Sequence, residues 1–158
     1  MTKHMLKHAS TRLPPRWGWA VFLFVWLMFI WGHSFVVGPD SSMESGRFVE
    51  LLTPLFHAAG VFDTEIMIFV VRKCAHFSEY FILSIIVANN CRVHGWKYSK
   101  ALIAYLYSIA VPFIDESIQL FIPGRQSSLR DVVIDTVGLA VGAFFTWAYF
   151  RHKHVKLA

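Results

Sequence analysis

Four long apolar stretches, separated by clusters of charged residues, dominate this sequence. The clearest covers residues 17–37 and contains no acidic residue, lysine or arginine. A bilayer core about 30 Å thick requires roughly 20 apolar residues for each helical crossing. We therefore expect the chain to cross a membrane several times.

The other three stretches are apolar over part of their length and charged over the rest. They cover about residues 66–88, 101–122 and 131–150. Hydrophobic residues make up 56% of the chain and its mean hydropathy is +0.49, which is too apolar for a soluble domain of this length. The first stretch is too long for a signal peptide and lacks a small-residue cleavage site, so we expect it to be retained.

Lysine and arginine are distributed unequally between the two sides that four crossings would create. The side that holds both termini and the loop between the second and third stretches has ten of the fifteen basic residues and none of the ten acidic ones. The ten are Lys3, Lys7, Arg12, Arg16, Arg92, Lys97, Lys100, Arg151, Lys153 and Lys156. Basic residues in short loops stay cytoplasmic, so these are topology anchors rather than a nucleic-acid surface.

This asymmetry predicts a multi-pass protein of the plasma membrane with both termini in the cytoplasm. We expect one transmembrane domain over residues 17–150, between basic cytoplasmic tails at residues 1–16 and 151–158. A cysteine placed at Gln126 should then react with an impermeant thiol reagent in intact cells. Nothing in the sequence predicts an oligomeric state.

The segment over residues 38–65 is predicted to contain an amphipathic helix outside the cytoplasm. Ser41 and Glu44 have the spacing of a capping box, and the helix should end near Pro54 or by Gly60. Apolar residues then recur at helical spacing at Phe48, Leu51, Leu52, Leu55 and Phe56. The fold class is therefore all-α: a bundle of four transmembrane helices plus an amphipathic extracytoplasmic helix, which is either a lid or a substrate gate.

Ten polar side chains lie in or beside those parts of the second, third and fourth stretches that face the outside. They are Lys73, His76, Glu79, Tyr80, Asp115, Glu116, Gln119, Arg125, Asp131 and Asp135. A charged side chain at the bilayer centre costs at least about 2.5 to 3.5 kcal/mol, so they must face one another or a water-filled cavity. Opposite charges among them should pair. Any single residue, such as Gln119 or His76, has the alternative role of locking helices together.

The residue types indicate both chemistry and binding. His76 with Glu79 resembles an oriented base, and Asp115 with Glu116 an acid or a pair of divalent-cation ligands. A divalent cation is therefore the one cofactor that the residues suggest. The remaining positions would bind a substrate, and the cationic side chains of Lys73 and Arg125 would hold its phosphate. The other four positions are Tyr80, Gln119, Asp131 and Asp135.

Two local patterns make further predictions. Ser128 and Asp131 have capping-box spacing, which indicates a helix that begins near residue 129. Gly138 and Gly142 are one turn apart, a spacing that is typical of close packing between transmembrane helices.

Three ordered blocks of residues resemble the VanZ-like family over roughly residues 28–146. The first has His33-Ser34 with Ser41 and Ser45, the second is KCAHFSEY at residues 73–80, and the third is DESIQLFIPGR at residues 115–125, followed by Ser128, Asp131, Asp135, Gly138 and Gly142. The resemblance implies a four-helix bacterial membrane protein of the cell envelope, in a family whose namesake is linked to low-level teicoplanin resistance. It implies no mechanism.

Three functions compete. The first is a site that binds an anionic lipid or lipid-linked cell-wall precursor, with or without modifying it. The second is a non-catalytic protein that shields such a precursor or acts in envelope stress. Enzymatic activity therefore belongs only to the first of these functions. The third is proton-coupled transport. A transporter of this kind would have polar groups through the full depth of the bundle, whereas the cytoplasmic halves here are almost wholly apolar.

Overall fold

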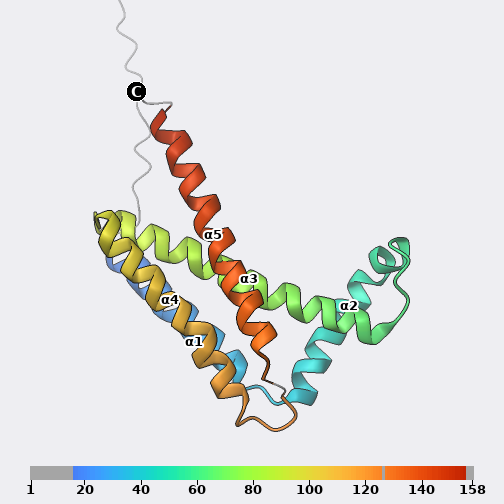
Figure 1. Ribbon diagram of the computed structural model, residues 1–158. Helices are drawn as coiled ribbons and strands as arrows, with labels where there is room; N and C mark the ends of the chain where they lie inside the picture. Colours follow the sequence, from blue (N-terminus) through green and yellow to red (C-terminus); the bar gives the residue numbers. More distant parts are fainter. Residues whose placement is uncertain (1–15, 126, 156–158) are drawn as a thin grey trace, which may run out of the picture.

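The computed structural model describes residues 16–125 and 127–155, and these residues form five helices and no strand. The helices are α1 (Arg16–Ser34), α2 (Gly38–Ala58), α3 (Thr64–Val93), α4 (Tyr98–Gln119) and α5 (Leu129–Val155) (Figure 1). The all-α prediction is confirmed for this part of the chain. Gln126 and most of the two predicted tails lie outside the described residues.

Three of the five helices are long and apolar enough to cross a membrane. They are Arg16–Ser34, Tyr98–Gln119 and Leu129–His152. They correspond to the first, third and fourth predicted crossings. The second prediction falls in α3, which is longer at 30 residues but carries Arg72 and Lys73 in its first half and Glu79 at its middle.

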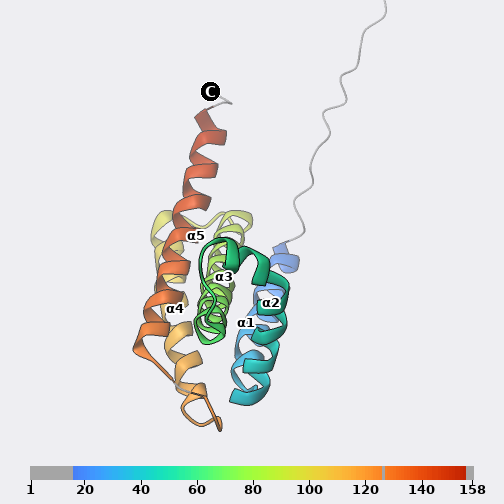
Figure 2. The same cartoon turned by 90° about the vertical axis from the view of Figure 1, so that its right-hand side faces the viewer.

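The central helix of the fold is α3, which contacts each of the other four helices. Figure 2 shows it nearly end-on, with α4 and α5 on one side and α1 and α2 on the other. Side-chain hydrogen bonds to backbone oxygens tie the neighbours to it. Trp26 Nε1 of α1 donates to Glu79 O at 3.0 Å, and Tyr105 of α4 donates to Ser84 O at 3.1 Å.

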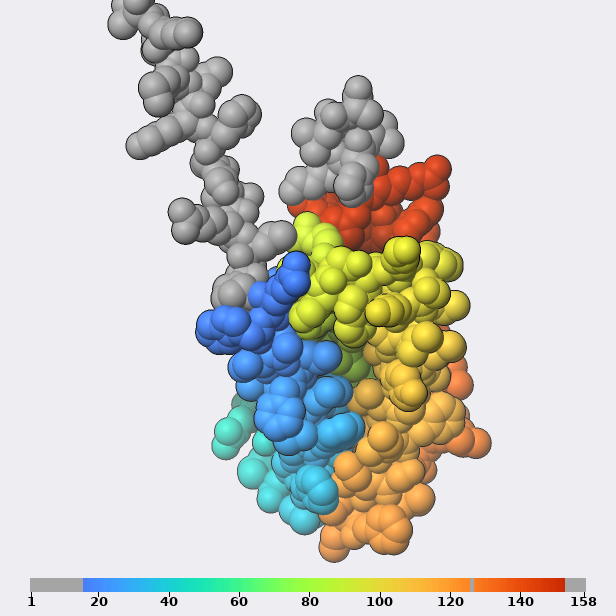
Figure 3. All heavy atoms as spheres, turned by 90° about the vertical axis from the view of Figure 1, so that its left-hand side faces the viewer, coloured from blue at the N-terminus to red at the C-terminus, as the bar shows by residue number. Residues whose placement is uncertain are grey.

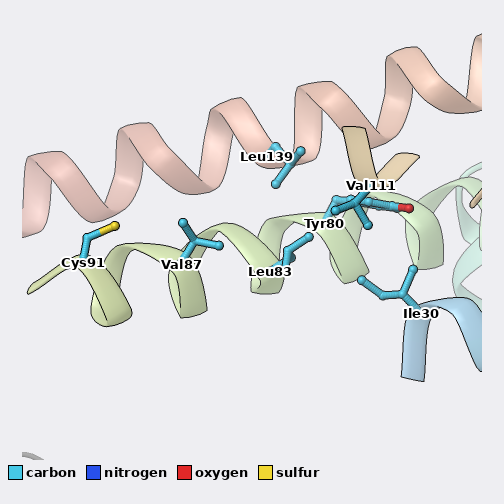
Figure 4. Close-up of a cluster of buried hydrophobic side chains, with 7 residues drawn as sticks. All are labelled: Ile30, Tyr80, Leu83, Val87, Cys91, Val111 and Leu139. Atoms are coloured by element: carbon cyan, nitrogen blue, oxygen red, sulfur yellow. The ribbon is translucent and has the colours of Figure 1, made fainter. Parts of the chain in front are cut away.

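An apolar core lies along the second half of α3 (Figure 4). Its buried members are Ile30, Tyr80, Leu83, Val87, Cys91, Val111 and Leu139. Large apolar side chains also cover the outer surface, including the face that α1 and α4 form side by side (Figure 3). A soluble monomer rarely exposes so large an apolar area, whereas a lipid-facing surface requires one.

Two glycines allow α5 to approach α3 closely. A Cβ atom added at Gly138 would lie 2.6 Å from Phe77 O, and one added at Gly142 would lie 2.7 Å from Phe81 O. Neither position has room for a side chain. The prediction of close helix packing at this pair is therefore confirmed.

The predicted start of the amphipathic helix was wrong. No side chain caps α2, which begins at Gly38 after an extended Val37 and has Pro39 in its first turn, where proline is well suited. The backbone N–H of Gly38 donates instead to Pro123 O at 3.1 Å, in the connection between α4 and α5. Ser41 thus lies inside the helix rather than at its cap.

The close approach of these two connections depends on glycine. Gly124 has φ +74°, and a Cβ atom added at Gly38 would lie only 1.9 Å from Gly124 O. At its other end α2 continues past Pro54 to Ala58, two residues before Gly60, which has φ +78°. This end agrees with the second of the two predicted positions.

The predicted start of α5 is confirmed at Leu129, and Ser128 caps it by accepting from Arg130 N at 3.1 Å. The other half of the capping box is not formed by Asp131. The backbone N–H of Ser128 donates instead to Glu116 Oε2 at 2.8 Å, which joins the start of α5 to α4.

Candidate functional site

Polar side chains gather where α1 and α4 end and α5 begins, beside the first half of α3. We term this region the polar end. Four of its side chains, from three helices, form a buried cluster: His76, Asp115, Glu116 and Asp135. One nitrogen or oxygen atom of each lies within 4.8 Å of those of the other three, and all four residues are buried.

Hydrogen bonds orient the two carboxylates that α4 contributes to the buried cluster. Gln119 Nε2, one turn further along the helix, lies 3.4 Å from Asp115 Oδ2 and 3.2 Å from Glu116 Oε1. The hydroxyl of Ser34, the last residue of α1, donates to Asp115 Oδ1. Ser34 was not predicted as a site residue, although its place at the end of the first apolar stretch puts it on the same side as the acids.

The other two members of the buried cluster face each other across α3 and α5. His76 Nδ1 lies 3.4 Å from Asp135 Oδ1, which is an ion-pair distance without hydrogen-bond geometry. Within the described residues, neither oxygen of Asp135 has a hydrogen-bond partner, and neither does the hydroxyl of Tyr80. Both residues have 0% of their surface exposed.

His76 and Glu79 were predicted to act together, but their recorded partners differ. His76 faces Asp135, whereas Glu79 Oε1 lies 3.2 Å from His33 Nδ1 on α1. The other ring nitrogen of His33 lies 3.3 Å from Glu44 Oε2 of α2. Glu79 therefore belongs to a separate junction that joins α1, α2 and α3.

Lys73 of α3 and Asp131 of α5 form an ion pair, in agreement with the expectation that opposite charges among the polar residues pair. Both residues also line a polar pocket of about 490 Å³ at the surface of the polar end. We term it the basic pocket, and its lining residues are Glu65, Ile68, Phe69, Arg72, Lys73, Gly124, Ser127, Ser128, Arg130 and Asp131.

Arg72 and Arg130 give the basic pocket its character. Within the part of the chain that the structure describes, neither guanidinium forms an ion pair or a hydrogen bond. Neither residue was predicted as a site residue. Helical spacing offered a signal for Arg72, because it lies four residues before His76 on the same face of α3.

Arg125, which was predicted to contact phosphate, is not among the residues that line the basic pocket. Its Nε donates to Val36 O at 3.0 Å, one terminal nitrogen to His33 O at 2.8 Å and the other to Ser41 Oγ at 3.0 Å. Burial lowers the pKa of its guanidinium, and the nearby charge of Arg72 lowers that pKa further. A guanidinium still remains protonated in proteins, so Arg125 is a charged clamp on the connection between α1 and α2.

The buried cluster and the basic pocket are neighbours. Lys73 of the pocket precedes His76 of the cluster by one turn on α3, and Asp131 precedes Asp135 by one turn on α5. Residues three or four apart lie on the same face of a helix. An anion in the pocket would therefore lie about one helical turn from His76 and Asp135 of the buried cluster.

The model of the VanZ/LLP1 protein family matches residues 19–151 of this chain. The match includes all ten predicted site residues and all five helices in whole or in part. Neither a curated protein nor a solved structure matches the chain.

Proposed function

Because the chain belongs to the VanZ/LLP1 family, we propose that it is a plasma-membrane protein whose polar end binds the phosphate of an anionic lipid or of a lipid-linked cell-wall precursor. In this proposal α3 is the fourth crossing and the polar end faces outward. The charge asymmetry of the loops supports that orientation.

The length and charge distribution of α3 support a fourth crossing. Its 30 residues are about 45 Å long at 1.5 Å per residue, more than a bilayer core requires. Residues 81–88 in its second half are almost wholly apolar. Most of the polar side chains of its first half face other helices or the basic pocket, where they avoid the energetic cost of contact with lipid.

The placement of α2 supports its role as an amphipathic helix of the outer leaflet. Its buried face consists of Gly38, Ser41, Ser45 and Val49. Phe48, Leu51 and Leu55 are instead 60–75% exposed, so the apolar face points away from the protein. Lipid is the solvent that would cover such a face.

The free guanidinium groups of the basic pocket carry the proposal. Arg72 and Arg130 lie in one pocket, and Lys73 there is already neutralised by Asp131. Guanidinium groups bind phosphate oxygens bidentately, and the hydroxyls of Ser127 and Ser128 add neutral donors. The pocket thus offers the donors that a phosphate head group requires.

Apolar side chains beside the guanidinium groups favour a lipid over free phosphate. Ile68 and Phe69 line the same pocket, and Leu129 and Val133 on α5 are 79% and 60% exposed. An acyl or polyprenyl chain would cover this apolar surface while the phosphate binds the arginines.

The proposal is tested by the binding of short-chain phosphatidylglycerol and phosphatidylcholine to the purified protein in a neutral detergent. A charge-assisted hydrogen bond contributes roughly 1.5 to 3 kcal/mol, so Arg72→Gln with Arg130→Gln should weaken phosphatidylglycerol binding at least about tenfold. Arg47→Gln, an exposed arginine outside the pocket, is the matched control.

Two outcomes would count against the proposal. Unchanged phosphatidylglycerol binding by the double variant would exclude the pocket as the head-group site. Inorganic phosphate that binds as tightly as the lipid would instead show that the apolar surface contributes nothing.

Modification of the bound head group is the second candidate, because the buried cluster lies one turn from the basic pocket. Shielding of a lipid-linked precursor requires the pocket alone, whereas chemistry requires His76 and Asp115 as well. If His76→Ala or Asp115→Asn abolishes protection against teicoplanin while lipid binding persists, shielding alone is insufficient. If protection survives both substitutions, the chemistry is excluded.

A further inference from the structure

The buried cluster brings three carboxylates together in a part of the fold that water reaches poorly. Asp115, Glu116 and Asp135 are each at most 4% exposed, and one oxygen of each lies within 4.8 Å of the others. Like charges at such distances repel strongly in a medium of low dielectric constant. Something other than solvent must compensate for them.

The basic residues of the polar end do not supply that compensation. Lys73 pairs with Asp131, and Arg125 donates to two carbonyl oxygens and a serine hydroxyl. Within the described residues, no lysine or arginine forms an ion pair with any of the three carboxylates. His76 is the one basic member of the cluster, and a single imidazolium balances one carboxylate at most.

Polar atoms without partners point to a missing ligand. Asp135 is fully buried, yet neither of its oxygens has a hydrogen-bond partner in the described part of the chain, and its one charged neighbour is His76 Nδ1 at 3.4 Å. The hydroxyl of Tyr80, also fully buried, lies close enough to Asp115 and Asp135 to interact electrostatically with both. In Figure 4 it points away from Leu83 and the rest of the apolar core. Buried polar groups are nearly always hydrogen-bonded or bound to an ion.

We propose that the buried cluster binds a divalent transition-metal ion, Zn²⁺ or Mn²⁺, through one donor atom of each of its four members. Ligand atoms on opposite sides of a metal with bonds of 2.0 to 2.4 Å are about 4.0 to 4.8 Å apart. The four donor atoms all lie within 4.8 Å of one another, so no pair exceeds that separation. One imidazole and three carboxylates suit Zn²⁺ or Mn²⁺ better than Mg²⁺ or Ca²⁺, which prefer oxygen alone.

The hydrogen bonds around the cluster match those of a metal site. Metal-binding carboxylates are usually held in place by donors outside the coordination sphere. Gln119 contacts both Asp115 and Glu116, and Ser34 and the Ser128 N–H each hold one of these carboxylates. Each carboxylate oxygen retains a second lone pair for the metal. The metal would lie one turn from the basic pocket, but its binding does not depend on whether that pocket binds a lipid.

The test measures metal content in the full chain, purified without a histidine tag and stripped with a chelator. His4, His8, His152 and His154 are replaced by Gln, so that metal bound by histidines near the termini is not counted. After dialysis against Zn²⁺ or Mn²⁺ we expect about one ion per chain. Asp135→Asn should weaken binding at least about tenfold, whereas Glu50→Gln, an exposed acid on α2, should leave it unchanged.

A second measurement decides the matter if Asp135→Asn does not fold. Pulsed electron paramagnetic resonance of Mn²⁺ bound to the otherwise intact chain, labelled with ¹⁵N-histidine, should show a coupling to one imidazole nitrogen. That coupling should be absent from His76→Gln. A chain that retains no metal, an Asp135→Asn variant that binds as tightly as the parent, or bound Mn²⁺ without a nitrogen coupling would each overturn the proposal.

Discussion

Arg125 uses all three guanidinium nitrogens to hold the connection between α1 and α2. Its partners are the carbonyl oxygens of His33 and Val36 and the hydroxyl of Ser41. Because the α4–α5 connection carries Arg125, this one side chain fixes how the ends of three helices meet. Its role in the described structure is therefore that of a clamp.

Replacement of Arg125 by lysine should destabilise the protein although it keeps the positive charge. An ammonium group lacks the planar fork of a guanidinium, so we expect it to reach only one of the three acceptors. The free energy of unfolding should therefore fall by about 2 to 4 kcal/mol. Thermal unfolding in detergent measures the change. Arg130→Lys is the control, because that side chain makes no hydrogen bond within the described residues. Equal melting temperatures for both variants would contradict the clamp.

The sequence predicted which residues are polar and buried better than it predicted their partners. Helical spacing placed Asp115 beside Gln119 and Asp131 beside Asp135, since those relations lie within one helix. It paired His76 with Glu79 for the same reason. The recorded partner of His76 is Asp135 of α5, and which faces of two helices meet depends on their crossing, which spacing along one chain does not encode.

At the scale of elements, the packing of α5 on α3 depends on two glycines that have no room for a Cβ atom. We expect Gly142→Ala to lower stability by about 1 to 3 kcal/mol, because the new methyl group would lie 2.7 Å from both Phe81 O and Ser84 Cβ. Melting temperatures of the purified variants test this expectation.

The same substitution at Gly46 of α2 is the matched control. A Cβ atom there would meet nothing within 4 Å, so Gly46→Ala should stabilise the helix by about 0.5 to 1 kcal/mol. If Gly142→Ala melts at or above the temperature of Gly46→Ala, α3 and α5 do not pack as closely as described.

Helix positions were predictable because apolar stretches and turn residues are local signals. The start of α5 at Leu129 was predictable because Ser128, the residue before it, is a favoured cap for a helix start. The predicted cap of α2, Ser41, lies four residues after the observed N-cap Val37, because the N–H of Gly38 is satisfied by Pro123 O, far away in the sequence. A capping pattern at Ser41 cannot reveal a partner supplied by another connection.

At the scale of the whole molecule, the charge asymmetry predicts that the polar end lies outside the cell. In a variant without its own cysteines, through Cys74→Ser and Cys91→Ala, we expect Ser127→Cys to react with an impermeant maleimide in intact cells. Tyr98→Cys, at the start of α4 and 85% exposed, should react only after lysis. Labelling in the opposite order would reverse the orientation.

Native mass spectrometry of the protein released directly from its own membrane tests the central claim most directly, since the account requires an occupied head-group pocket. We expect the parent chain and Arg47→Gln to carry a bound phosphate-containing anionic lipid, and Arg72→Gln with Arg130→Gln to lose most of it. A parent chain that carries only zwitterionic lipids, or a double variant with undiminished occupancy, would contradict the account.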